Sequence, residues 1–236
     1  SHIQNMNLFF RNFFFHFCFF TSTKLIQNIL FSNKCLILFK LNFVFLKMTY
    51  FDFHHHKKDT NSGIYNLELS DDAHQSDFSI GILPEKINAN FENEFLKIEQ
   101  IAQQKNCIAI GECGLDSRFS SKDFTQEFVF KKHLELAENL EKPIIIHCVK
   151  RFMETISICK KYEIPKIIHG FNKNKNIAND LLKNNFYLSF GKAVFQNVSL
   201  QEIIKEIPIY RLFLETDATD FDLFLLYEKV KEKKKI

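Results

Sequence analysis

Residues 106–116 read NCIAIGECGLD, and residues 107–112 within this stretch predict a buried strand that delivers one carboxylate, that of Glu112, to a glycine-flanked strand end. The run from Cys107 to Ile110 is apolar without polar alternation, which is typical of a parallel strand covered on both faces. Gly111 and Gly114 flank the acid and let the backbone approach it closely. A carboxylate in such a place needs a cation or hydrogen-bond donors. Taken alone, the stretch fits a Lys or Arg partner as well as a metal or catalytic role.

Short apolar runs recur along the chain and, with this one, make eight predicted strands. The other seven cover residues 50–53, 64–69, 78–83, 143–148, 166–171, 186–191 and 211–217. Helical patterns, with apolar residues three and four positions apart, lie at 90–104, 124–140, 152–161, 175–183, 200–206 and 223–234. Strands alternating with helices predict an α/β fold, the (β/α)8 TIM barrel.

We expect a trimmed barrel for two reasons. The first two connections, 57–63 and 70–77, are too short for full crossover helices. The length from Met48 onward is also below the ~250 residues usual for this fold.

The first 47 residues differ from the remainder of the chain. They hold 12 of the 29 Phe, five basic residues and no acid, so the remainder has a net charge of −2 although the whole chain has +3. The Arg11 and His16 side chains interrupt the Phe-rich run, which argues against a secretory signal and a spanning helix. We interpret residues 1–47 as a non-native upstream extension before a true start at Met48, with a membrane-associated arm as the alternative. Residues 48–236 then form the barrel domain.

Charge and cysteine usage bound the function classes. Without residues 1–47 the balance is slightly acidic, which gives no reason to expect a basic nucleic-acid face on the main body. The six cysteines show no CxxC pair and no framework spacing, so we interpret them as reduced core thiols of a cytoplasmic protein. A membrane partner is not expected.

Polar residues follow the predicted strands at the ends where barrels build their active sites. They are His54, His56, Glu112, His147, His169 and Asp217. Any single one is compatible with a packed core residue or a solvated loop, but four histidines and two acids on one rim favour a metal site. Oxygen and imidazole ligands without thiolate suit Mg²⁺, Mn²⁺ or Zn²⁺. Six groups exceed what one tetrahedral ion needs, which favours two divalent ions sharing Glu112.

The motifs DFHHH, GECGLD, IIIHC, IIHGF and LETDA, in that order, resemble the TatD family of metal-dependent deoxyribonucleases, in a compact branch of these amidohydrolase-like barrels. The resemblance extends from Met48 to about Phe221. It implies metal ligands at His54, His56, Glu112, His147, His169 and Asp217. It also implies that Asp217 takes a proton from the attacking water, with Glu112 and Asp217 as the catalytic pair.

Three features depart from the family pattern. Leu83 stands where the family has a histidine after the third strand, which affects a substrate contact. Val149-Lys150-Arg151 replaces the family's arginine after the fifth strand. The chain ends at KVKEKKKI, where family members continue through a further helical segment, so a shortened C-terminal part is expected.

The leading hypothesis is a two-metal phosphodiesterase with DNA as its substrate and no stable protein partner. Phosphate contacts are predicted at Lys150, Arg151, Lys173 and Lys175, in the loops after the fifth and sixth strands, although a solvated loop would look the same. One alternative is that the same site hydrolyses a small-molecule ester, lactone or amide, because barrel and ligands do not fix the substrate. Another is an inactive, truncated remnant.

Overall fold

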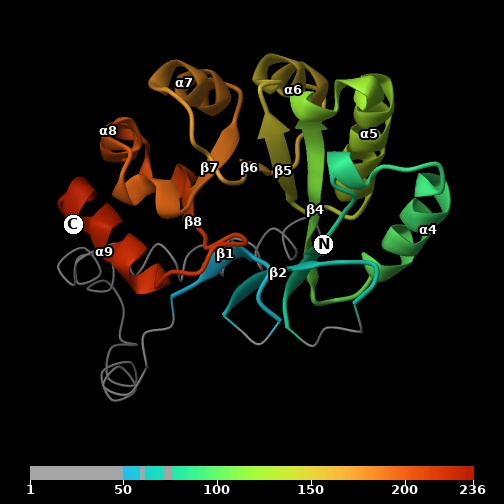
Figure 1. Ribbon diagram of the computed structural model, residues 1–236, viewed down its shortest axis with the longest axis horizontal. Coiled ribbons are helices and arrows are strands. Elements are labelled where there is room, and N and C mark those ends of the chain that lie inside the picture. The colour runs from blue at the N-terminus through green and yellow to red at the C-terminus, as the bar shows by residue number, and fades with distance from the viewer. Residues whose placement is uncertain (1–49, 59–61, 72–75) are drawn as a thin grey trace, which may run out of the picture.

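The computed structural model describes residues 50–58, 62–71 and 76–236, and its core is one sheet of eight parallel strands with helices on the outer side (Figure 1). The strand order follows the chain. The strands are β1 (Asp52–His55), β2 (Gly63–Leu67), β3 (Phe78–Ile80), β4 (Cys107–Asp116), β5 (Ile144–Val149), β6 (Lys166–Ile168), β7 (Phe186–Phe190) and β8 (Leu212–Leu214). The predicted (β/α)8 barrel is confirmed.

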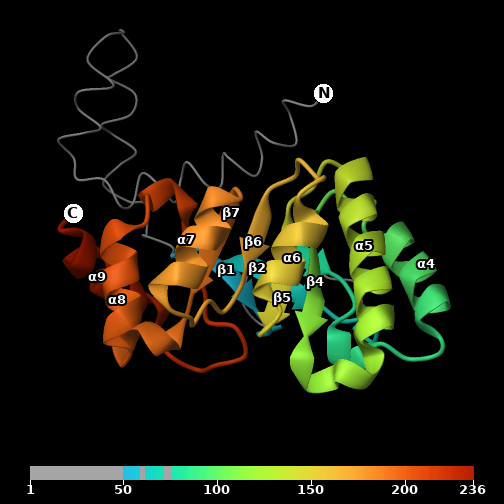
Figure 2. The same cartoon turned by 90° about the horizontal axis from the view of Figure 1, so that it is seen from above.

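Six α-helices follow the later strands, and all six were predicted. They are α4 (Phe91–Ile101), α5 (Asp123–Asn139), α6 (Phe152–Cys159), α7 (Lys175–Lys183), α8 (Val198–Glu206) and α9 (Leu223–Lys234). Figure 2 shows them beside one another along the outside of the sheet. The described residues between β1, β2 and β3 contain no helix, which agrees with the short first connections. Residues 1–47, expected to be an upstream extension, lie outside the described residues.

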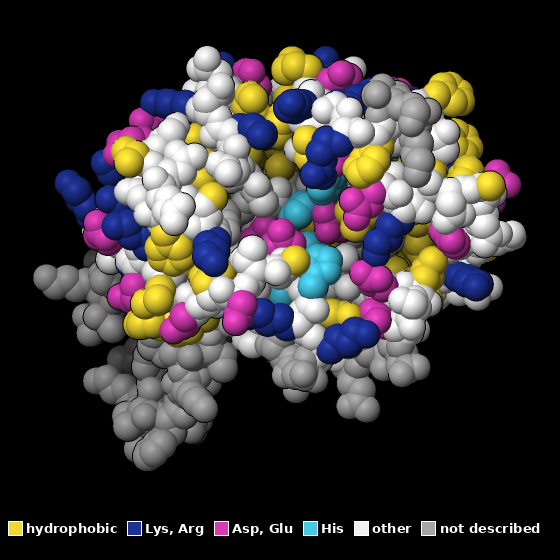
Figure 3. Space-filling model, in the orientation of Figure 1, with side chains coloured by type: hydrophobic (Ala, Val, Ile, Leu, Met, Phe, Trp, Pro, Cys, Tyr) yellow, Lys and Arg dark blue, Asp and Glu magenta, His cyan; other side chains and the backbone are white. Residues whose placement is uncertain are grey.

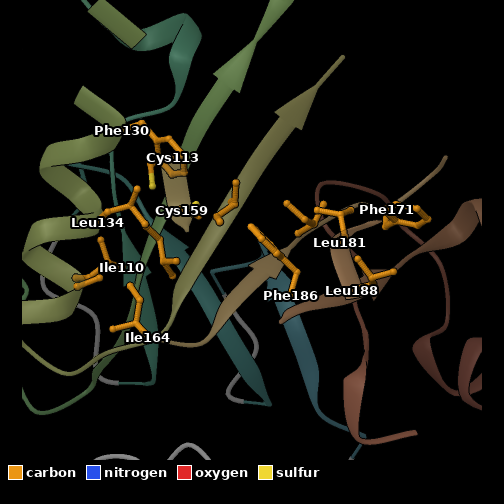
Figure 4. Close-up of a cluster of buried hydrophobic side chains, with 14 of the residues drawn as sticks. Ile110, Cys113, Phe130, Leu134, Cys159, Ile164, Phe171, Leu181, Phe186 and Leu188 are labelled. Atoms are coloured by element: carbon orange, nitrogen blue, oxygen red, sulfur yellow. The ribbon is translucent and has the colours of Figure 1, made fainter. Parts of the chain in front are cut away.

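An outer core fixes the helices on the strands. Phe130 and Leu134 of α5 point toward Ile110 and Cys113 of β4 (Figure 4), and all four side chains are fully buried. Burying one such large apolar side chain stabilises the fold by about 1.5–3 kcal/mol relative to leaving it exposed. This packing holds β4, and with it Glu112, in a fixed position.

A second apolar cluster fills the inside of the barrel beneath the predicted site. Its members are Phe53, Ile64, Ala109, Ile145, Ile167 and Phe213, which come from six different strands. Residues two apart in a strand share a face. Ile145 therefore places His147 on the inner face, Ile167 does the same for His169, and Phe213 does so for Glu215. The inner cluster therefore lies directly beneath these polar side chains.

The first and last strands are joined where the barrel closes. The backbone N–H of Asp217 donates to the carbonyl oxygen of His54 at 2.9 Å, and His55 and Asp217 form an isolated parallel bridge. One residue earlier, the Thr216 backbone N–H and hydroxyl donate to the two oxygens of Asp52 at 2.8 and 2.6 Å. Burial raises the pKa of the Asp52 carboxyl to about 6 against the lowering effect of these bonds. The DFHHH and LETDA motifs thus meet at one seam.

The structure corrects the predicted ends of two strands. Glu112 and His147 were expected at the ends of their strands, but β4 continues to Asp116 and β5 to Val149. The extension arises because residues 113–116 pair with residues 146–149 of the neighbouring strand after a shift of register. Glu112 therefore lies at an irregularity inside β4 and not at its end.

Four of the six cysteines lie within the described residues. Cys107, Cys113, Cys148 and Cys159 are all free, as predicted, whereas Cys18 and Cys35 lie outside the described residues. Burial raises the pKa of the Cys107 and Cys148 thiols to about 11, which leaves them protonated and unreactive near neutral pH. No helix within the described residues has the length and apolar character of a membrane span.

Candidate metal centre

Glu112 lies at the centre of the site, and its two oxygens face different pairs of histidines. Oε1 lies 2.8 Å from His147 Nδ1 and 2.7 Å from His169 Nε2. Oε2 lies 3.3 Å from His54 Nε2 and 3.9 Å from His56 Nε2. Figure 3 shows histidine side chains in a hollow of the surface with acidic side chains beside them. The carboxylate thus divides the four imidazoles into two sets.

Two features of the backbone bring Glu112 to this place. Gly111 has φ +128°, and a Cβ on it would lie 2.3 Å from the carbonyl oxygen of Ile145, so only glycine fits there. The backbone N–H of Glu112 donates to Asn66 Oδ1 of β2 at 3.1 Å. The glycine before the acid, visible in the sequence, is therefore a requirement of the close approach between β4 and β5.

His54 and Asp217 meet on the Oε2 side of Glu112. The Oδ1 atom of Asp217 lies 3.8 Å from His54 Nε2 and 3.5 Å from His56 Nε2. His54 is fully buried, and neither of its ring nitrogens has a hydrogen-bond partner among the described residues. A buried polar atom left in this state is costly. A metal ion among these oxygen and nitrogen atoms would satisfy it, so the residues present fit a bound cation.

The ring nitrogen of His147 that faces away from Glu112 contacts the carboxylate of Asp116, which was not predicted from the sequence. His147 Nε2 lies 3.0 Å from Oδ2 of Asp116, while Nδ1 of the same ring faces Glu112. Asp116 is almost fully buried and also accepts hydrogen bonds from the guanidinium of Arg118. Burial would raise the pKa of Asp116, but the bonds from Arg118 and His147 lower it to about 2. Asp116 therefore stays ionised and fixes which nitrogen of His147 points into the site.

A second buried acid stands behind His169. Glu215 is fully buried, and its Oε1 accepts a hydrogen bond of 2.6 Å from the backbone N–H of Gly170. The same oxygen lies 3.5 Å from His169 Nδ1, so that Nε2 faces Glu112. The two histidines on the Oε1 side are thus both backed by a carboxylate.

The electrostatics of the cluster keep its central acids ionised. Burial opposes ionisation of Glu112, but the charge of His169 and the hydrogen bonds from His147 and His169 hold its pKa well below the usual value. The pKa of Asp217 is also lowered, against its burial, by the hydrogen bond from His56. Ionised carboxylates beside imidazoles are the donor set that divalent cations bind.

Three overlapping groups among the described residues could each hold an ion. They are His54, His56 and Glu112; His54, His169 and Asp217; and Glu112, His147 and His169, each with ligand atoms within 4.8 Å of one another. All six predicted ligand residues therefore come together at one end of the barrel. Three positioning residues, Asp52, Asp116 and Asn66, were not predicted. Asp116 was within reach of sequence analysis, because a strand continued to it would place it on the same face as Glu112.

The structure separates the four predicted phosphate-binding residues. Lys150 and Lys173 line a cavity whose other lining residues come from α6 and α7. Arg151 is buried and its guanidinium forms a 2.7 Å ion pair with Glu127 of α5, while Lys175 pairs with Glu206 of α8 at 2.6 Å. These two cations neutralise acids of the protein itself.

The fold and the site together define a (β/α)8 barrel with a candidate histidine–carboxylate metal centre. The chain belongs to the TatD-related DNase family, whose model matches residues 46–233. A relative in Buchnera aphidicola, named as a metal-dependent hydrolase, is 34% identical over 59% of this chain and 55% of its own length. YabD of Bacillus subtilis, named in the same way, is 37% identical over 54% of this chain and 52% of its own length.

Solved structures show the same fold at low sequence identity. The TatD homologue YjjV of Escherichia coli is 16% identical, with a TM-score of 0.64 over 78% of this chain and 89% of its own. A TatD family hydrolase of Entamoeba histolytica is also 16% identical, with a TM-score of 0.59 over 72% and 73%. The chain spans about half the length of the curated relatives it matches.

Proposed function

We propose that this chain is a divalent-metal-dependent hydrolase that cleaves phosphodiester bonds in DNA. The observation that supports it most is that the two oxygens of Glu112 face different pairs of histidines. Oε1 faces His147 and His169, and Oε2 faces His54 and His56. A carboxylate arranged in this way suits a bridge between two ions. The family supports the substrate, because a relative in Vairimorpha ceranae, 29% identical, has deoxyribonuclease in its name.

Each ion would have its own set of protein ligands. His54, His56 and Asp217 would hold one, and His147 and His169 the other, with Glu112 shared. Two bound divalent ions would polarise a phosphoryl oxygen and lower the pKa of a bound water molecule. Carboxylate and imidazole ligands are compatible with Mg²⁺, Mn²⁺ and Zn²⁺.

Asp217 is the residue best placed to accept the proton of the attacking water. Its side chain is 38% exposed, whereas that of Glu112 is 5% exposed. Of these two acids, only Asp217 is therefore accessible from solvent. Its lowered pKa keeps it ionised and able to accept a proton near neutral pH. Glu112, whose oxygens face four imidazoles, acts as a ligand.

Lys150 and Lys173 are the cations that we assign to the phosphates of the substrate. Neither has an ion-pair partner within the described residues, and both follow strands that supply a histidine of the site. Loss of one phosphate contact weakens binding of all sequences alike and reduces its dependence on salt.

A nuclease assay tests the proposal directly. The full chain should shorten single-stranded and double-stranded oligonucleotides when Mg²⁺, Mn²⁺ or Zn²⁺ is added, and a chelator should abolish the cleavage. Glu112→Ala purified in parallel is the control for a contaminating nuclease. Absence of cleavage with every metal, together with hydrolysis of a small carboxylic ester or lactone, would replace DNA by a small-molecule substrate. Leu83, in place of the family's histidine, is the feature that favours this second substrate class.

A further inference from the structure

A cavity of about 250 Å³ is lined by residues of α6 and α7 and by Lys150 and Lys173 of the loops that precede these helices. The two helices are neighbours in both ribbon views (Figures 1 and 2). Lys150 follows His147 by three residues, and Lys173 follows His169 by four. An extended chain covers at most ~3.6 Å per residue, so these lysines lie within about 11 and about 14 Å of the two histidines. The cavity is therefore within reach of a substrate held at the metal centre.

The inner part of the cavity is apolar. Phe152 and Ile156 of α6 are 8% and 7% exposed and form its floor, and the half-buried Ile177 of α7 lines it from the other side. Its volume is slightly below the ~300–1,000 Å³ of pockets that enclose drug-sized molecules. The cavity has room for one ring system with an apolar face and not for an oligonucleotide.

The mouth of the cavity is charged, with both signs present. Lys150 is exposed and Lys173 half-buried, so both ammonium groups can meet an anion at the mouth. Glu154 and Asp180 also line the cavity. These acids disfavour a ligand that is only anionic, but their oxygens can accept hydrogen bonds from ring amino groups. An apolar floor, two cations and two acceptors match a ring that bears a phosphate and exocyclic nitrogen.

The backbone at the mouth adds a further observation. Lys150 has φ +58°, a conformation that residues with a Cβ seldom adopt. The residue connects β5, which carries His147, to α6, which forms the floor. Lys150 therefore lies in the turn between the strand that carries His147 and the helix that lines the cavity.

We propose that this cavity binds the base of a nucleotide next to the cleaved phosphodiester bond, with Lys150 and Lys173 beside its phosphate. The inference rests on the proposed function, which supplies DNA as the substrate. A base can enter only when it is unpaired and out of its stack. The cavity therefore makes single-stranded ends the better substrate.

Equilibrium binding tests the cavity without any need for catalysis. The full chain is titrated in a calorimeter with deoxyadenosine monophosphate and, separately, with deoxyribose 5-phosphate, which lacks the base. A chelator is present so that no metal ion contributes to phosphate binding. We expect the nucleotide to bind about tenfold more tightly or better, because one base stacked in an apolar site commonly contributes that much. Equal affinities, or no nucleotide binding, would overturn the proposal.

Variants then place the binding in this cavity. Ile177→Trp fills the space and should weaken nucleotide binding about tenfold or more, whereas Leu96→Trp on the exposed face of α4 is the matched control and should not. Should Ile177→Trp fail to fold, Lys173→Ala and Lys150→Asn replace it, since Asn tolerates the positive φ. Parent-like affinity in all of these variants would show that the base binds elsewhere.

The outcomes separate this inference from the nuclease function. A chain that binds the nucleotide through the cavity but cleaves no DNA would refute the nuclease function and leave the cavity assigned. A chain that cleaves DNA with equal rates before and after Ile177→Trp, and without preference for the nucleotide over the sugar phosphate, would refute the cavity and leave the nuclease function intact.

Discussion

Asp217 combines two roles that a single substitution can separate. Its Oδ1 lies near His54 and His56, and its side chain is the more exposed of the two site acids. Asp217→Asn keeps the shape and one coordinating oxygen but removes the charge and the basic lone pair. We predict that the variant retains at least one metal ion and still binds DNA, yet cleaves it about a hundredfold or more slowly. Single-turnover cleavage at saturating metal measures this, and a rate near that of the parent would show that the proton goes elsewhere.

Asp116 positions His147 without reaching the substrate. Its Oδ2 accepts from Nε2 of His147 at 3.0 Å, and loss of such a partner commonly costs 10–100-fold in metal affinity. Asp116→Asn should therefore weaken metal binding by this factor, measured by competition with a metal-sensitive dye. Catalysis should recover largely when the metal concentration is raised. A rate defect that persists at saturating metal, with unchanged metal affinity, would contradict the positioning role.

The six ligand residues could be predicted from the sequence because each follows a recognisable apolar run and strand alternation places it on a known face. The sequence could not predict which basic side chains are free to contact phosphate. Arg151 and Lys175 have the residue type of phosphate-binding side chains, but Glu127 and Glu206, which pair with them, come from helices distant in the sequence. Only the folded arrangement reveals such long-range pairs.

The loop after β3 depends on one buried histidine of α5. His133 Nδ1 donates to the Val129 carbonyl oxygen at 2.8 Å, and its Nε2 accepts from the backbone N–H of Ile82 at 3.0 Å. Nε2 therefore has to stay unprotonated in the folded chain. Burial lowers the pKa of His133 from its ordinary 6.5 to about 4.

This pKa predicts acid destabilisation through the loop after β3. Since the folded-state pKa is below the unfolded value, the unfolded chain binds the proton first, and the stability from neutral His133 is lost as pH falls from about 6.5 to 4. The loss amounts to about 3 kcal/mol. Urea unfolding of the parent and His133→Asn should show a stability difference that shrinks over this range. A difference independent of pH would contradict the assignment.

The helices and most strands could be predicted because apolar spacing alone decides them, and α7 and α9 have the predicted ends. The length of β4 could not be predicted from the sequence. The pattern of apolar residues ends at Ile110, and the extension to Asp116 depends on pairing with β5 after the irregularity at Gly111. A glycine in a strand indicates such an irregularity but does not say whether pairing resumes beyond it.

Closure of the barrel joins residues 164 positions apart, since the Thr216 hydroxyl donates to Asp52 Oδ2. Thr216→Val keeps the shape and removes this donor. We predict a loss of about 1–3 kcal/mol in the free energy of unfolding, because the buried carboxylate is left with one donor fewer. Urea unfolding in the presence of a chelator measures it, and Thr216→Ser should recover most of the loss. Equal stability of the valine variant would show that the seam is held by other contacts.

The proposed two-metal hydrolase requires that one carboxylate, that of Glu112, holds two ions at the end of the barrel. The direct measurement is the number of divalent ions bound per chain, by elemental analysis after dialysis, in the parent and in Glu112→Ala, with circular dichroism to show that both are folded. We predict two ions in the parent, and loss of both tight sites together with DNA cleavage in the folded variant. Two ions retained by Glu112→Ala, or a single ion in the fully active parent, would contradict the shared-carboxylate centre.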